Sequence, residues 1–261
     1  MPPEHYSKKT SPTQLTWPMR DVIVIGGGCW GYHHVSRLLR ARDTGLTQFR
    51  HLLVVDHALE TRVKDELGTH PDVRHIHAEW DQFLRGFIED ADDEADGTSG
   101  DHIIPAPLAP HLFQHWLLHA LTVQLAPRTV RSEPVRHTFE QPFVKLGQDG
   151  ALYFSFADWL CPAACTEPER CPATRGPRTW EQSRFLRAQA QAWPDVSALI
   201  VLVCEQIALG VASVSVRQLR AEREQVLTLA RARQTPLTIL IATVSACHGA
   251  MGQIEIQAPL A

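Results

Sequence analysis

The glycines at residues 26–28, followed by another at residue 31, most constrain how this 261-residue chain can fold. Residues 21–25 read DVIVI, an apolar run of the kind found in strands buried on both faces. Residues 31–42 then place apolar side chains at helical spacing. Glycines between a strand and a helix allow a tight turn in which the backbones of the two elements lie close together. The segment therefore predicts a strand, a glycine turn and a helix packed back on that strand.

The same alternation continues through the first 125 residues. Residues 51–56 form a second apolar run, and residues 73–78 predict a third strand. Residues 60–67 and 80–88, which follow these two segments, have helical character. A fourth run, residues 102–106, ends in prolines. Strands that alternate with helices are typical of a parallel sheet with right-handed crossovers. We therefore expect an α/β fold with a doubly wound, mostly parallel sheet.

The glycines match the pattern G-x-G-x-x-G. Gly26 suits the tight turn, Gly28 lets the backbone approach a pyrophosphate, and Gly31 lets helix and strand pack closely. Asp56 ends the second strand, where a carboxylate can accept hydrogen bonds from ribose hydroxyls. With these features residues 20–125 resemble the Rossmann-type dinucleotide-binding superfamily. The resemblance implies NAD as cofactor, since a carboxylate at this position repels the 2′-phosphate of NADP.

Two alternatives stay open for this turn. Methyltransferases that use S-adenosylmethionine also combine a glycine turn with a later acidic residue. A doubly wound protein can also carry such a turn and bind no dinucleotide.

The chain divides into three parts. Residues 1–17 predict a disordered tail, and residues 18–126 a Rossmann-like nucleotide-binding domain. Residues 127–261 predict a C-terminal α/β part that contains a β-hairpin around Gly147-Gln148-Asp149-Gly150 and a cysteine-rich metal loop at residues 161–177. We expect the later strands to extend the first sheet.

Three of the six cysteines gather in that loop. Cys161, Cys165 and Cys171 lie within eleven residues, and thiolates are ligands for zinc and for iron–sulfur clusters. A fourth ligand is predicted from Cys247 or His248, which follow the apolar run LTILIAT. The spacing does not separate zinc from a cluster, although proline directly after Cys161 and Cys171 slightly favours the cluster. The alternative is a set of unligated, reduced thiols.

His111 is a weaker candidate for an acid–base residue. It follows the fourth predicted strand, and ligands of open α/β sheets bind at the carboxyl ends of the strands. His115 and His119 continue on the same helix face at a spacing of four residues. The favoured interpretation of these three residues is a half-buried histidine stripe packed against Leu112 and Trp116.

Composition excludes several classes of protein. A net charge of −4 offers no basic surface for nucleic acid. The longest apolar stretch, residues 197–216, contains Glu205 and Gln206 at its middle, so it does not predict a membrane span. With neither a leader nor a span recognised, we expect a cytoplasmic protein that could form a homo-oligomer and act on a small molecule.

These features favour an NAD-dependent oxidoreductase with a cysteine-ligated metal or iron–sulfur centre near the nucleotide. One alternative is a non-catalytic NAD(H) or nucleotide sensor with a structural zinc. The other is a methyltransferase. The sequence does not decide whether the protein is an enzyme.

Overall fold

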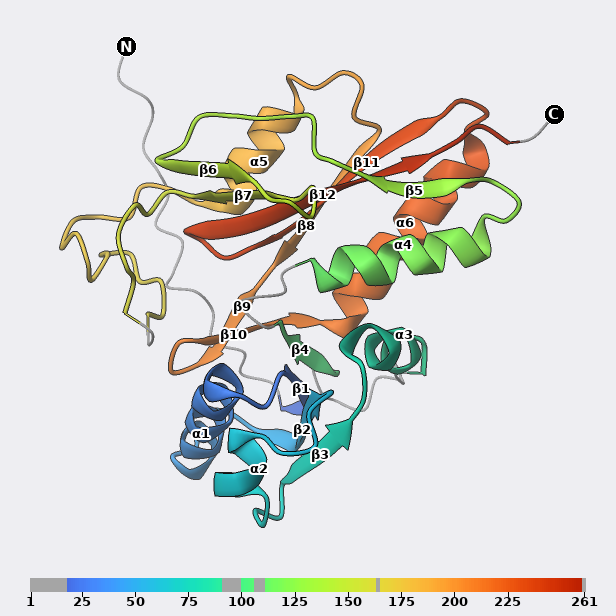
Figure 1. Ribbon diagram of the computed structural model, residues 1–261. Helices are drawn as coiled ribbons and strands as arrows, with labels where there is room; N and C mark the ends of the chain where they lie inside the picture. Colours follow the sequence, from blue (N-terminus) through green and yellow to red (C-terminus); the bar gives the residue numbers. More distant parts are fainter. Residues whose placement is uncertain (1–17, 91–99, 106–110, 163–164, 260–261) are drawn as a thin grey trace.

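The computed structural model describes residues 18–90, 100–105, 111–162 and 165–259 (Figure 1). The described chain is a mixed α/β fold with two mixed sheets and six helices. The helices are α1 (Cys29–Asp43), α2 (Arg62–Leu67), α3 (Trp80–Asp90), α4 (Leu112–Gln124), α5 (Gln182–Ala190) and α6 (Val216–Ala232). The expected tail, residues 1–17, lies outside the described residues.

The first sheet has the strand order β3-β2-β1-β4-β10-β9. Its strands are β1 (Met19–Ile25), β2 (Phe49–Asp56), β3 (Val73–His77), β4 (His102–Ile104), β9 (Glu205–Ala208) and β10 (Val211–Ser215). The pairs β3-β2, β2-β1 and β1-β4 are parallel, whereas β10 is antiparallel to both β4 and β9. The sheet is therefore mixed, with the predicted parallel strands at one side.

Helices cover both faces of this sheet, as Figure 1 shows. Alternate residues of a strand face opposite ways, so β1 contributes to two separate cores. Ile23 packs into the core that includes Leu84 of α3, and Val24 into the core that includes Val35 of α1. The uninterrupted apolar runs of β1 and β2 are explained by this double burial.

The second sheet has the order β6-β7-β12-β11-β8, and β5 also pairs with β12. Its strands are β5 (Val130–Glu133), β6 (Phe143–Leu146), β7 (Leu152–Ser155), β8 (Ala198–Val203), β11 (Leu237–Val244) and β12 (His248–Ile256). Helices α4 and α6 share a core with one face of this sheet, and α5 shares a core with the other face. The hairpin predicted around residues 147–150 is the connection between β6 and β7.

The expectation of one continuous sheet is wrong. Strands β8, β11 and β12 form the second sheet, and only β9 and β10 join the first. The chain passes between the sheets at Cys204, which separates β8 from β9. Strand β12 pairs along its length with β11, β5 and β7, so both of its edges are occupied within the second sheet. Within the described residues, no helix is long and apolar enough to cross a membrane.

Candidate functional site

The glycine turn forms between β1 and α1 as predicted. Gly26 has φ +88°, a left-handed conformation that glycine adopts without strain. A Cβ atom on Gly31 would lie 1.9 Å from the carbonyl oxygen of Gly26, so only glycine fits at position 31. Gly28 is the N-cap of α1, where no side chain caps the helix, and a Cβ there would meet nothing within 4 Å. The helix N-terminus therefore faces open space across Gly28.

Asp56 ties this turn to the end of β2. Its Oδ2 atom accepts a hydrogen bond of 2.6 Å from the backbone N–H of Gly27, and its Oδ1 atom accepts one of 2.9 Å from Ala58. The Asp56 side chain is 14% exposed, so one edge of the carboxylate remains open to solvent. Each carboxylate oxygen can accept more than one hydrogen bond, so capacity remains for a ligand hydroxyl.

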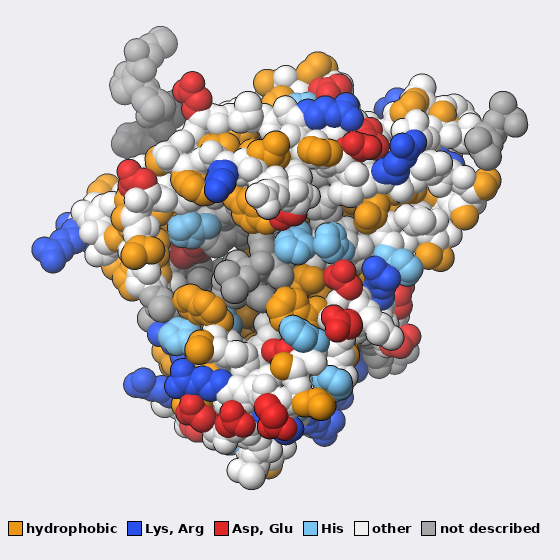
Figure 2. Space-filling view, viewed as in Figure 1, with side chains coloured by type: hydrophobic (Ala, Val, Ile, Leu, Met, Phe, Trp, Pro, Cys, Tyr) orange, Lys and Arg blue, Asp and Glu red, His pale blue; other side chains and the backbone are white. Residues whose placement is uncertain are grey.

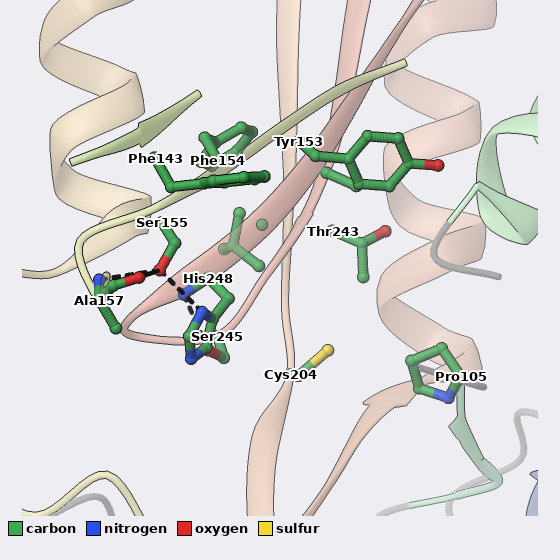
Figure 3. A pocket seen from close by; sticks show the side chains of 13 residues that line it. Pro105, Phe143, Tyr153, Phe154, Ser155, Ala157, Cys204, Thr243, Ser245 and His248 are labelled. Carbon is green, nitrogen blue, oxygen red and sulfur yellow. Dashed lines mark hydrogen bonds between the residues drawn. The ribbon is translucent and has the colours of Figure 1, made fainter. Parts of the chain in front are cut away.

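A cavity of about 420 Å³ lies between the two sheets. Its walls come from β6, β7, β11 and β12 of the second sheet and from Pro105 and Cys204. Figure 3 shows the rings of Phe143, Phe154 and Tyr153 along one wall, with Pro105 and Cys204 away from them. The surface is hollowed between the two halves of the molecule in Figure 2, and histidine side chains lie around the rim.

One residue of the cavity wall, Pro105, lies near the carboxyl end of β1, where the glycine turn begins. Val24 pairs with Ile104 in parallel register, so Pro105 stands level with Ile25, the residue before the turn. Neighbouring strands are about 4.8 Å apart. The cavity wall therefore begins one strand away from Gly26.

His248 supplies the polar corner of the cavity. Its Nδ1 atom lies 2.9 Å from the Ser155 hydroxyl oxygen, and its Nε2 atom lies 3.6 Å from the sulfur of Cys161. Ser155 is the register partner of His248 across β7 and β12. Partial burial lowers the pKa of His248, the nearby charge of Glu167 opposes that shift, and the residue as a whole is exposed to solvent. Among the described residues that line the cavity, His248 is the single residue that could carry a charge near pH 7.

The cysteine loop docks against the turn between β11 and β12. The Glu167 carboxylate accepts a hydrogen bond of 3.0 Å from the backbone N–H of Ala246. Burial raises the pKa of Cys161, and the neighbouring charges of Cys165, Cys171 and Glu167 raise it further. The loop thus brings Cys161 next to His248 and holds Glu167 at the turn before β12.

The remaining cysteines differ in their surroundings. Cys165 accepts a 3.4 Å hydrogen bond from the backbone N–H of Glu167. Hydrogen bonds from the backbone of Thr174 lower the pKa of Cys171. The sulfur of Cys247 instead accepts a hydrogen bond of 3.2 Å from the Trp180 indole, and burial raises its pKa to about 11. Within the described ranges, no group of three or more His, Cys, Asp or Glu side chains is arranged to hold a metal ion.

His111 lies outside the cavity wall, just before α4. Its Nδ1 atom is 3.9 Å from Asp149 and has no hydrogen-bond partner among the described residues, and its ring centre is 4.8 Å from that of His115. Burial, and next the charge of His115, lower the pKa of His111. These contacts agree with a half-buried histidine pair and give His111 no contact with the cavity. His119 is exposed on the same helix.

Sequence reasoning missed Ser155 and Thr243. Ser155 orients His248, and Thr243 points into the cavity from β11 (Figure 3). Neither residue belongs to a motif, because both reach the site through the pairing of β7, β12 and β11. The one available signal was strand alternation, which places Ser155 on the same face as Tyr153.

Comparison with known proteins gives one match. The family described as "Uncharacterized protein, C-terminal domain" matches residues 113–257, more than half of the chain, and the chain belongs to this family. No curated protein and no solved structure matches. The matched segment contains all strands of the second sheet and the Cys161–His248 pair, whereas the glycine turn precedes it.

Proposed function

We propose that the chain is an NAD-dependent oxidoreductase that binds the dinucleotide at the glycine turn and a small substrate in the cavity. The parallel order β3-β2-β1-β4, with the glycine turn after β1 and an acidic residue after β2, supports a Rossmann-type nucleotide site. The uncapped N-terminus of α1 offers N–H groups and a positive dipole end to a pyrophosphate.

The observation that carries the proposal is the position of Pro105, a residue of the cavity wall, beside the carboxyl end of β1, where the glycine turn begins. A dinucleotide whose pyrophosphate lies over Gly28 extends across the carboxyl ends of β1 and β4. Pro105, at that edge, is part of the cavity wall. The wall is mainly apolar, which suits a nicotinamide ring and a small substrate.

The Asp56→Ala variant tests the ribose contact. We expect NAD to bind about tenfold or more weakly, since a hydrogen bond to a charged group contributes about 1.5–3 kcal/mol. Discrimination against NADP should also relax, because the carboxylate that repels a 2′-phosphate is gone. Titration calorimetry with NAD and NADP measures both effects. Asp72→Ala is the matched control, since Asp72 pairs with Arg42 beside the amino end of β3.

The Thr243→Phe variant tests the cavity as the nicotinamide site. Thr243 is 8% exposed and lines the cavity, so the larger ring should fill part of the space. We expect NAD affinity to fall by about tenfold while affinity for ADP-ribose, which lacks the nicotinamide, stays within about twofold. Thr238→Phe, on the same strand but outside the cavity wall, should change neither affinity.

Three results would contradict the proposal. Equal binding of NAD to wild type and to the Asp56→Ala variant would remove the role of the turn. Binding of S-adenosylmethionine in place of NAD would indicate a methyltransferase. Binding of NAD with no hydride transfer to or from any member of a panel of alcohols, aldehydes and keto acids would indicate a sensor.

A further inference from the structure

We propose that the thiol of Cys161 adds to the carbonyl carbon of an aldehyde bound in the cavity, with His248 as the base that takes the thiol proton. This site deepens the proposed function, on which it rests, by naming neutral aldehydes as the substrate class. The covalent step itself needs no NAD, so it can be tested separately from the nucleotide site. The contact between the two side chains at the edge of the cavity carries the inference.

The two side chains are brought together by the pairing of β7 with β12. Ser155 in β7 is the register partner of His248. Next to it, the N–H of Phe156 donates a hydrogen bond of 3.0 Å to the carbonyl oxygen of Cys247. The chain that leaves β7 is therefore still attached to β12 shortly before it reaches Cys161. The Cys161 sulfur lies 3.6 Å from the Nε2 atom of His248, within the reach of a hydrogen bond to sulfur.

A third group lies on the other side of the imidazole. The Nδ1 atom of His248 is 2.9 Å from the Ser155 hydroxyl oxygen, which is itself 2.8 Å from both the backbone nitrogen and the carbonyl oxygen of Ala157 (Figure 3). A nucleophile within reach of a base, with a further group that orients the base, is the arrangement used in covalent catalysis. To take the thiol proton, His248 must have Nε2 unprotonated and Nδ1–H directed at Ser155, and this tautomer is part of what we propose.

The surroundings of Cys161 explain why it needs a base. Cys161 is a free, half-buried thiol. Burial raises its pKa, and the nearby charges of Cys165, Cys171 and Glu167 raise it further. The thiol is thus protonated near neutral pH, whereas the thiolate is the nucleophilic form. Partial burial lowers the pKa of His248, against the opposing charge of Glu167, so the imidazole can accept a proton at that pH.

The cavity beside this pair suits a small neutral substrate. His248 lies in its wall, and the rings of Phe143, Phe154 and Tyr153 line another part of it (Figure 3). The described residues of the wall include no Asp, Glu, Lys or Arg, so a charged substrate would lose its hydration without gaining a partner. The volume of about 420 Å³ is in the range of small-molecule sites. We therefore expect an aldehyde with an apolar substituent, such as an aromatic ring.

The covalent step is an addition that needs no further reactant. As the sulfur–carbon bond forms, the π electrons of the carbonyl group move onto its oxygen, and the thiol proton passes to Nε2 of His248. The same proton then moves from the imidazole to that oxygen. The product is a neutral thiohemiacetal, and its formation is reversible and changes no oxidation state overall. Its carbon keeps the aldehyde hydrogen, which is the hydrogen that an oxidoreductase removes as hydride.

The test uses benzaldehyde labelled with ¹³C at the carbonyl carbon, added to the full-length reduced protein without NAD. We expect a saturable ¹³C signal from a tetrahedral carbon, distinct from the signals of the aldehyde and its hydrate. The Cys161→Ser variant should lose this signal. Cys165→Ser is the matched control, because it changes another half-buried thiol of the same loop, and it should keep the signal.

The His248→Gln variant separates a base from a structural role. A base changes the rate of addition and not its equilibrium. Loss of the conjugated carbonyl absorption of benzaldehyde, followed by stopped flow, should therefore be about a hundredfold slower in this variant. The final amount of adduct should stay within about twofold of the wild type.

Alkylation of the wild type gives a test that does not depend on variant stability. Labelling by iodoacetamide, located by peptide mass spectrometry, should be slowed at Cys161 by benzaldehyde. Benzyl alcohol, which has a similar shape but no electrophilic carbon, should not slow it.

Absence of the adduct in a wild type that binds NAD would overturn the aldehyde assignment and leave the nucleotide proposal intact. An adduct that persists in Cys161→Ser would overturn the role of Cys161, and an unchanged rate in His248→Gln would overturn that of His248. Stoichiometric zinc or iron that blocks alkylation of Cys161 would also overturn the proposal, because the sulfur would then be a ligand. Adduct formation by a protein that does not bind NAD would support this site and contradict the proposed function instead.

Discussion

The Gly28→Val variant is expected to fold like the wild type and to bind NAD about a hundredfold more weakly. Gly28 is exposed, its backbone is extended (φ −72°, ψ −153°), and an added Cβ would meet nothing within 4 Å. The ψ angle lies about 30° beyond the usual β region of L-residues, so valine is expected to add some backbone strain at this exposed position without preventing folding. Its side chain would nevertheless occupy the space in which the pyrophosphate approaches the N-terminus of α1. The loss of about 2.7 kcal/mol corresponds to the expected hundredfold.

The matched control is Gly86→Val. Gly86 is an exposed residue of α3, a Cβ added there would meet nothing within 4 Å, and the residue is remote from the turn in sequence. Both variants should show a melting temperature close to that of the wild type. Calorimetric titration with NAD should then separate them. Undiminished NAD binding by a folded Gly28→Val variant would show that the ligand does not use the turn.

The elements of the first sheet could be predicted because they depend on local sequence. The runs 21–25, 51–56 and 73–78 become β1, β2 and β3 with shifts of at most two residues at their ends. The apolar character of the first two runs comes from burial on both faces, which helices α1 and α3 provide, whereas β3 is an edge strand in which only Val73 is buried. Because each of these patterns lies within a single segment, the strand can be predicted without knowing how the rest of the chain folds.

The second sheet could not be predicted in the same way. An apolar strand such as 237–243 can add to any exposed edge, and nothing in its residues selects one sheet over another. The position of this strand in the second sheet is determined by β12, which pairs with β11 on one side and with β5 and β7 on the other. These partners are up to 126 residues apart along the chain, from Val130 to Ile256.

The candidate site could likewise be predicted only in part, because strand pairing brings some of its residues together. Residue type alone identifies Cys161 and His248, and the structure brings them within 3.6 Å of each other. Ser155, whose hydroxyl lies 2.9 Å from the Nδ1 atom of His248, escapes such reasoning, because a serine in a strand has no signature of its own. The predicted centre of four ligands stays a prediction, because among the described residues no three such side chains are arranged to hold a metal ion.

The Gly31→Ala variant is expected to lose both stability and NAD binding. The alanine Cβ would lie 1.9 Å from the carbonyl oxygen of Gly26 and 2.9 Å from its carbon. These are backbone atoms of a turn whose next residue, Gly27, is bonded to Asp56, so they cannot move away without breaking that contact. We expect a loss of about 3 kcal/mol or more, which in a chain of this size lowers the melting temperature by about 6–12 °C.

The opposite result is expected for Gly86→Ala, which provides the control. Gly86 lies in α3 with open space where a Cβ would be added, and alanine in a helix is favoured over glycine by about 1 kcal/mol. The same substitution should thus destabilise at residue 31 and stabilise slightly at residue 86, as measured by thermal denaturation. A Gly31→Ala variant as stable as the wild type would mean that α1 can move off β1. The close approach of Gly31 to Gly26 would then not be what shapes the turn, and the argument for a phosphate-sized space over Gly28 would fail with it.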